Sequence, residues 1–156
     1  MNKTEFNKKS YTPRRRSRIY ALECLFCLEL NPDHPDQTIR DIALMFPDKE
    51  SIYEFCREIV LLTSNHLEQI DTSICSALTN WNIDRLSVID KNIIRMSIAE
   101  LIYLKTIPPE VTINEAIELG RLFGNEDSPK FINAILDTVA KKNNLMAKTN
   151  ENRDHQ

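Results

Sequence analysis

Four arginines within five positions are the side chains whose type and spacing most clearly point to chemistry: Arg14, Arg15, Arg16 and Arg18. A guanidinium donates paired hydrogen bonds to a phosphate, which the ammonium of lysine cannot do. Residues 1–18 hold seven basic and one acidic side chain, a net charge of +6, whereas the remaining residues hold 13 basic and 22 acidic side chains, a net charge of −9. A basic cluster on an acidic chain indicates a binding site for a polyanion, above all a nucleic acid. The alternative is a solvated surface turn, because basic clusters alone are not specific.

The two residues before the arginines predict that this cluster begins a helix. Thr12 is a good N-cap and Pro13 suits the first helical position, so the arginines should occupy the first turn. Positive charges are disfavoured there, because the N-terminal end of a helix dipole is itself positive. We expect a ligand anion to relieve this conflict.

A second basic residue with an aromatic neighbour, Lys130 with Phe131, lies near the other end of the chain. The pair Ser128-Pro129 predicts that a helix begins here, which places Lys130 at its N-terminus. An aromatic ring beside a cation can stack and hold unpaired RNA bases. The simpler interpretation is that Phe131 belongs to the core.

The four cysteines do not predict a metal site. Cys24 and Cys27 have the spacing of metal ligands, but they lie within an apolar helical run and no second pair accompanies them, whereas a structural zinc site needs four ligands. Together with Cys56 and Cys75 they are expected to be reduced, packed thiols. No metal or other cofactor is expected.

The chain is also predicted not to be an enzyme. His66 lies on the interior stripe of a helix, and no nucleophile or acid accompanies it at motif spacing. The only two glycines of the chain are Gly120 and Gly124, and a phosphate-binding or dinucleotide-binding loop needs several closely spaced glycines.

Apolar residues recur with helical spacing along nearly the whole chain, and no segment competes with the period of a strand. Ser51, Ser87 and Thr112 are each followed three residues later by Glu or Asp and are expected to open three of the helices, and Gly124 is expected to end the helix that Thr112 opens. The expected helices are 13–30, 38–46, 51–79, 87–107, 112–123 and 128–142. These patterns predict an all-α fold: a single compact domain of about six or seven helices over residues 13–142. Residues 1–12 are expected to be a flexible basic tail, and residues 143–156 a disordered or frayed one.

Neither end of the chain nor its interior predicts contact with a membrane. No apolar run approaches the roughly 18 residues that a bilayer-spanning helix needs. The start of the chain lacks the apolar segment of a secretory signal. The sequence therefore predicts a cytoplasmic protein.

Ile113 to Leu136 contains the runs Asn-Glu-Ala-Ile-Glu-Leu and Phe-Gly-x-Glu-Asp-Ser-x-Lys-Phe, and an Asn-x-x-Leu-Asp follows. This segment resembles the C-terminal signature of the NusB family of transcription antitermination factors. Asp90, Arg95, Glu100 and the arginine cluster also sit where that family has similar residues, so the resemblance covers about residues 13–142. It implies two three-helix sub-bundles. It also implies an RNA-binding factor that recognises the single-stranded boxA element of transcripts together with ribosomal protein NusE, and modifies RNA polymerase so that ribosomal RNA operons are transcribed processively.

The resemblance also assigns roles to residues. Arg14, Arg15, Arg16 and Arg18 would bind the RNA backbone, with Lys130 and Phe131 completing the surface, while the carboxylate of Asp127 would tune affinity by repelling phosphate. Phe26 and Asp90 match positions expected near the NusE interface. Pro129 departs from the family pattern, which usually has a polar or basic residue there, and this puts one RNA contact in doubt.

Two alternatives remain open on sequence alone. The nearly all-apolar second part of the first helix would suit a protein-binding scaffold or a homodimer. Some RNA cytosine methyltransferases carry a NusB-like RNA-binding domain, but this chain contains no glycine-rich site for a methyl donor.

Overall fold

The computed structural model describes residues 8–79 and 82–146, and within these ranges it confirms the all-α prediction. The described residues form seven α-helices and two short 3-10 helices. Their bounds are η1 (Lys8–Ser10), α1 (Pro13–Leu30), α2 (Pro35–Met45), α3 (Glu50–Asn65), α4 (Leu67–Ala77), η2 (Ile83–Arg85), α5 (Val88–Tyr103), α6 (Pro109–Phe123) and α7 (Ser128–Lys142).

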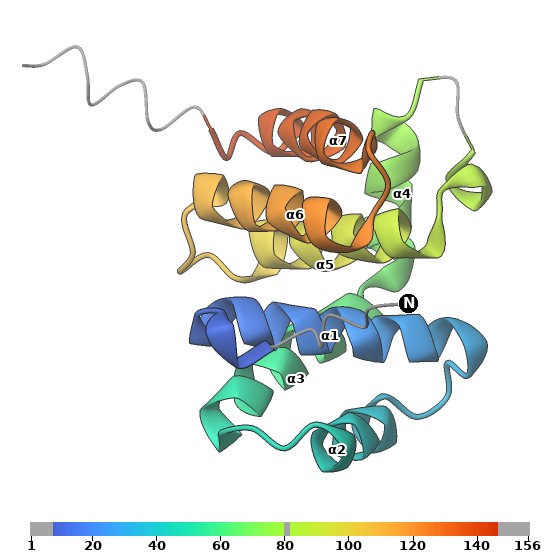
Figure 1. Cartoon of the computed structure of the whole chain (residues 1–156). Coiled ribbons are helices and arrows are strands. Elements are labelled where there is room, and N and C mark those ends of the chain that lie inside the picture. The colour runs from blue at the N-terminus through green and yellow to red at the C-terminus, as the bar shows by residue number, and fades with distance from the viewer. Residues whose placement is uncertain (1–7, 80–81, 147–156) are drawn as a thin grey trace, which may run out of the picture.

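The helices form two groups of three that pack on each other, with α4 linking them (Figure 1). In one group α1 packs against α2 and α3, and in the other α5, α6 and α7 pack together. Helices α1 and α5 contact each other across the boundary between the groups, and α4 packs against α5 and α7. One continuous core of buried residues runs through both groups.

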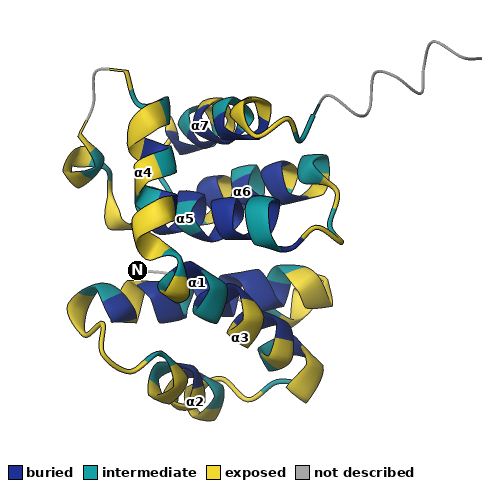
Figure 2. Cartoon of the chain, turned by 180° about the vertical axis from the view of Figure 1, so that it is seen from behind, coloured by how far each residue is buried: buried dark blue, intermediate teal, exposed yellow. Residues whose placement is uncertain are grey.

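Helices α1 and α5 lie at the centre of the molecule, where each packs on the helices of its own group and on the other central helix. Both are buried over most of their length, as Figure 2 shows, whereas α2 and α4 each present a broad exposed face. In α1 the residues from Arg16 to Leu22 are all buried, and in α5 Ile93, Ile94, Met96 and Ile98 are fully buried. From Ile19 onward α1 is apolar nearly all round, as expected for a helix in such a central position, whereas its buried Arg16, Ser17 and Arg18 have polar partners.

Two of the predicted helix starts are confirmed by their caps. The Thr12 hydroxyl accepts a hydrogen bond from the backbone N–H of Arg15 at 3.3 Å, and Pro13 is the first residue of α1. The Ser87 hydroxyl accepts from the N–H of Asp90 at 3.0 Å and opens α5.

Two other predicted caps are wrong, because these helices begin earlier. Helix α3 begins at Glu50 and α6 at Pro109, so Ser51 and Thr112 lie inside the first turn. Proline already has a helical φ and needs no partner for an N–H, and Pro109 therefore begins α6 almost one turn before Thr112.

The single helix predicted over residues 51–79 is interrupted at His66. This residue ends α3 and precedes α4, and its ring stacks on that of Tyr103 at the end of α5, with centroids 3.9 Å apart. The apolar residues keep their helical spacing across the break, because the buried residues of α3 and those of α4 follow one continuous helical repeat in the sequence. A local pattern therefore could not reveal the turn.

The two glycines permit a close approach of α6 and α7. A Cβ on Gly120 would lie 2.8 Å from Cδ1 of Ile132 and 3.4 Å from the backbone N of Pro129. A Cβ on Gly124, which ends α6 as predicted, would lie 2.4 Å from the Ser128 hydroxyl. That hydroxyl accepts a hydrogen bond from the N–H of Asn125 at 2.9 Å, so Ser128 closes the α6–α7 loop. The position of Lys130 and Phe131 is thereby fixed by backbone packing.

The described part of the predicted N-terminal tail lies against α1 and α2. Lys8 in η1 forms an ion pair with Glu23, and its ammonium lies 3.8 Å from the ring centroid of Phe46. Residues 1–7 of this tail and 147–156 of the C-terminal one fall outside the described residues. None of the described helices is long and apolar enough to cross a membrane.

Candidate nucleic-acid and partner interface

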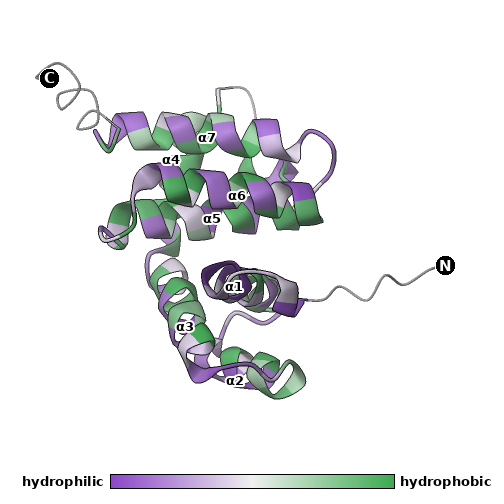
Figure 3. Ribbon diagram, turned by 60° about the vertical axis from the view of Figure 1, so that its left-hand side comes forward, coloured by the Kyte–Doolittle hydropathy of each residue, from purple (hydrophilic) through white to green (hydrophobic). Residues whose placement is uncertain are grey.

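The arginine cluster forms the strongly hydrophilic N-terminal end of α1, which faces the reader in Figure 3. Arg15 reaches across to α6 and donates two hydrogen bonds to Glu115, from Nε and from Nη2, both at 3.0 Å. This paired geometry is the one a guanidinium also offers to phosphate. Arg15 is half-buried, so its outer edge remains open to solvent.

Arg16 points the other way, to the loop between α2 and α3. It donates to the Asp48 carboxylate at 3.0 and 3.2 Å and to the carbonyl of Tyr11 at 3.0 Å. The hydroxyl of Tyr20 donates to the same carboxylate at 3.1 Å. Burial and the hydrogen bond to Asp48 raise the pKa of Tyr20 to about 12. Burial alone would raise the pKa of the Asp48 carboxyl, but hydrogen bonds from the Lys49 backbone and Arg16 outweigh it and lower that pKa.

We expect the Asp48 carboxylate to contribute to the loss of stability in acid. Because its pKa is lower in the folded than in the unfolded chain, its contribution is present above the unfolded value of about 3.9 and is lost as the pH falls through the folded value. Asp48→Asn should therefore make the free energy of unfolding fall less steeply below about pH 4, as measured by urea unfolding at a series of pH values. Asp33→Asn, in the exposed loop between α1 and α2, is the matched control. An acid limb as steep in Asp48→Asn as in the unaltered chain would contradict this role.

Arg18 is buried inside the molecule. Its Nε and Nη2 donate to the carboxylate of Glu100 in α5 at 3.0 and 2.7 Å, and the two side chains are only 4% and 1% exposed. Thr112 of α6 adds a longer hydrogen bond to the same carboxylate, at 3.5 Å. This ion pair joins α1 to α5 at the boundary between the two helix groups.

The expectation that a ligand anion relieves the charge conflict at this helix end is therefore corrected for three of the four arginines. Their counter-charges are carboxylates of the chain itself, on α6 (Glu115), before α3 (Asp48) and on α5 (Glu100). Sequence reasoning missed these partners.

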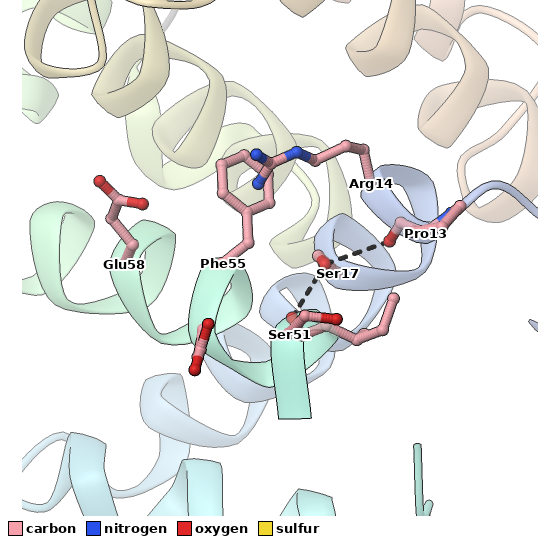
Figure 4. Close-up of a pocket in the computed structure, with 8 residues that line it drawn as sticks. Pro13, Arg14, Ser17, Ser51, Phe55 and Glu58 are labelled. Carbon is pink, nitrogen blue, oxygen red and sulfur yellow. Dashed lines mark hydrogen bonds between the residues drawn. The ribbon is translucent and has the colours of Figure 1, made fainter. Parts of the chain in front are cut away.

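Arg14 differs from its neighbours because it has no carboxylate partner among the described residues. It is exposed, and its guanidinium carbon lies 3.8 Å from the ring centroid of Phe55 in α3. The close-up in Figure 4 shows the guanidinium over the face of this ring, at the edge of a pocket between α1 and α3.

The N-terminus of α7 presents the second group of predicted residues. Lys130 is exposed and its ammonium has no hydrogen-bond or ion-pair partner among the described residues. Phe131 is half-buried and packs on the core, which leaves part of its ring accessible. Asp127 is exposed and directly precedes α7.

Both basic groups adjoin α6, but at different points along it. Pro129 packs on Gly120, whereas Arg15 contacts Glu115, five residues earlier and roughly 7 Å away along the helix axis. Helix α6 thus connects the arginine cluster with Lys130 and Phe131 without bringing the two groups into direct contact. A ligand that engages both must span the distance between them.

A separate apolar groove of about 380 Å³ lies between the second half of α1, α2 and the ends of α5 and α6. Phe26 lines it and is 44% exposed. Glu23 also lines it, and its Oε2 is buried with no hydrogen-bond partner among the described residues. Asp90 follows the groove residue Ile89, is itself buried, and likewise has a buried oxygen, Oδ1, without a partner in the described part of the chain. Such a groove suits an apolar segment of a protein that also carries hydrogen-bond donors.

The cysteines are less uniform than predicted. Cys24 and Cys56 are buried together, and their mutual hydrogen bond and burial raise the pKa of the Cys24 thiol. Cys27 and Cys75 are exposed, so the prediction of packing was wrong for these two. The described residues include no group of three or more His, Cys, Asp or Glu side chains that could hold a metal ion.

Comparison with known proteins gives a consistent result. A model of the NusB family matches residues 15–141. The transcription antitermination protein NusB of Thermotoga maritima is 40% identical over 131 residues, which cover 84% of this chain and 92% of the relative. That of Desulforamulus reducens is 39% identical over 123 residues, covering 79% and 86%.

Two solved structures show the same fold. The chain is similar to a crystal form of T. maritima NusB with a TM-score of 0.75 and 40% identity, covering 83% of this chain and 92% of that one. It is also similar to a chain in the structure of the antitermination factors NusB and NusE in complex with double-stranded RNA. There the TM-score is 0.77 with 27% identity, covering 83% of this chain and 97% of that one.

Proposed function

Because the chain belongs to the NusB family, whose members are non-enzymatic RNA-binding antitermination factors, we propose that it binds boxA-type RNA together with ribosomal protein NusE. In this proposal it acts in the cytoplasm within an RNA polymerase complex that transcribes ribosomal RNA operons processively. The observation that carries the proposal is the family match over residues 15–141. It is joined by two exposed cations, Arg14 and Lys130, that have no carboxylate partner within the described structure.

We assign different tasks to the four arginines. In this proposal Arg14 and the open edge of Arg15 contact RNA, together with Lys130 and Phe131 on α7. The guanidiniums of Arg16 and Arg18 form ion pairs with Asp48 and Glu100, which supports a role in holding the start of α1 in position. Asp127, beside the start of α7, would weaken phosphate binding through its negative charge.

The partner is assigned to the apolar groove beside Phe26 and Asp90. Its apolar lining and the buried Oε2 of Glu23, which lacks a partner in the described structure, support a protein segment as its occupant. The choice of NusE as that protein rests on the family and on the presence of NusE with NusB and RNA in the similar complex. A homodimer through the same groove is the competing use, and sedimentation of the chain without NusE distinguishes the two.

We expect a steep dependence of RNA affinity on salt concentration, because phosphate contacts release counterions. Fluorescent boxA RNA and a scrambled RNA should be titrated with the chain, alone and with NusE. Lys130→Ala should make the plot of log affinity against log salt shallower by about 0.7, the value for one contact to single-stranded nucleic acid. Arg40→Ala, an exposed charge on the distant α2, is the matched control and should leave the slope unchanged.

Two results would count against these assignments. If Lys130→Ala and Arg40→Ala give the same slope, Lys130 does not touch phosphate. If scrambled RNA binds as tightly as boxA RNA in the presence of NusE, the chain does not recognise boxA.

A further inference from the structure

We propose that the pocket between the first turns of α1 and α3 is a nucleobase-binding subsite, in which one unpaired base of the bound RNA stacks on Arg14. The inference rests on the proposed RNA-binding function and adds to it a base contact between α1 and α3. The pocket has a volume of about 350 Å³, and its walls include Pro13, Arg14, Ser17, Glu54, Phe55 and Glu58 (Figure 4).

The stacking platform is already assembled. Phe55 is only 6% exposed, and two guanidiniums lie near its ring, with the carbon of Arg14 at 3.8 Å and that of Arg18 at 5.4 Å from the centroid. Arg18 is in turn fixed by its buried ion pair with Glu100. The ring beneath Arg14 therefore has little freedom to move.

Ser17 connects the two helices that form the walls of the pocket. Its buried hydroxyl lies 2.8 Å from the carbonyl oxygen of Ile52 in α3 and 3.1 Å from that of Pro13 in α1, within hydrogen-bonding distance of both (Figure 4). This contact joins the first turns of the two helices. A ligand would consequently enter a preformed site and lose less affinity to ordering the protein.

Arg14 is the arginine of the cluster that can accept a base. Arg15, Arg16 and Arg18 each hold a carboxylate, whereas Arg14 has only the ring of Phe55 among the described residues. A guanidinium is planar, so a side chain that covers one face leaves the other available. Unpaired bases in protein–RNA complexes stack on such planes as they do on aromatic rings.

The carboxylates of Glu54 and Glu58 favour a base over a phosphate in this pocket. Glu54 and Glu58 are one turn apart on α3, both are exposed, and both line the pocket. They repel phosphate, but they can accept hydrogen bonds from the exocyclic amino group of adenine, cytosine or guanine. The pocket is thus suited to a base with an amino group while the phosphates remain outside. A basic protein side chain fits less well, because Arg14 would repel it.

The test uses the full chain with NusE and a set of boxA RNAs in which each base in turn is replaced by an abasic residue. Arg14→Lys keeps the positive charge but removes the planar face. In the unaltered chain one abasic position should cost roughly 5- to 150-fold in affinity, the range for loss of a stacked base. In Arg14→Lys the intact RNA should bind weaker by a similar factor, and the abasic substitution at that position should then cost nothing more. The other positions should respond equally in both proteins.

The control is Arg57→Lys, the same change on α3 at an exposed residue that pairs with Asp36 and does not line this pocket. It should match the unaltered chain at every position. The double variant Glu54→Gln/Glu58→Gln should reduce the preference for an amino-bearing base at the coupled position. If it instead tightens binding of every RNA by one factor, the carboxylates only repel RNA and the base assignment is wrong.

Further outcomes would overturn the subsite. Equal abasic losses in Arg14→Lys and the unaltered chain at all positions would show that no base stacks on Arg14. Weaker NusE binding in Arg14→Lys, with RNA binding unchanged, would assign the pocket to a protein segment. Equal binding of boxA and scrambled RNA counts against the proposed function alone, because the abasic series can be read in either RNA.

Discussion

Arg18→Ala is expected to lower the free energy of unfolding by about 3–5 kcal/mol, the usual cost of leaving one buried charge without its partner. The carboxylate of Glu100 would remain in the interior, 1% exposed, with only the longer hydrogen bond from Thr112. Because whole domains are stable by about 5–15 kcal/mol, this is a large share of the total. Urea unfolding followed by circular dichroism measures it.

Two comparisons separate this effect from a general loss of charge. Arg14→Ala removes an exposed guanidinium from the preceding turn of α1 and should cost no more than about 1 kcal/mol. Arg18→Met/Glu100→Met removes both charges and should recover much of the lost stability, since buried ion pairs can often be replaced by apolar side chains. If Arg18→Ala kept full stability but lost RNA affinity, Arg18 would be an RNA contact, as its sequence neighbours suggested.

The arginine cluster illustrates what could be predicted from the sequence. Its place at the start of a helix followed from Thr12 and Pro13, and the structure confirms it. Its division into three guanidiniums paired with carboxylates and one that lies over a ring did not follow. The signal that could have revealed one partner was Glu100, a carboxylate flanked by apolar residues in α5, because a buried carboxylate needs a cation. Which cation meets it depends on tertiary packing, because Arg18 lies 82 positions away in the chain.

The same limit applies to the surface around α6. The helical periods predicted α6 and α7, and Gly124 was identified as the end of α6. The close contact of Pro129 with Gly120 could not be predicted, since it depends on how the two helices cross. That contact determines the position of Lys130 relative to Arg15, and therefore the distance that an RNA bound to both residues must cover. Residue types indicated the chemistry, whereas the packing of two helices determines its geometry.

Phe26→Asp is expected to weaken NusE binding by roughly 30-fold or more, the size of effect seen for central aromatic residues of interfaces. The Phe26 side chain lines the apolar groove and is 44% exposed. A partner can therefore bury it, whereas it adds little to the stability of the chain without a partner. A carboxylate there would also add negative charge beside Glu23, whose Oε2 already lacks a partner in the described structure. Isothermal titration with NusE measures the loss, and the free energy of unfolding should change little.

Leu30→Asp is the matched control, because Leu30 lies one turn further along α1, is 83% exposed and does not line the groove. It should leave NusE affinity within about threefold of the unaltered chain, since surface substitutions away from a contact have small effects. Equal losses in both variants would move the interface from the groove to the exposed end of α1. If Phe26→Asp left NusE binding intact but converted a dimeric chain to a monomer, the groove would be a contact between two copies. The NusE affinity and the oligomeric state of Phe26→Asp therefore decide whether NusE or a second copy of the chain occupies the groove.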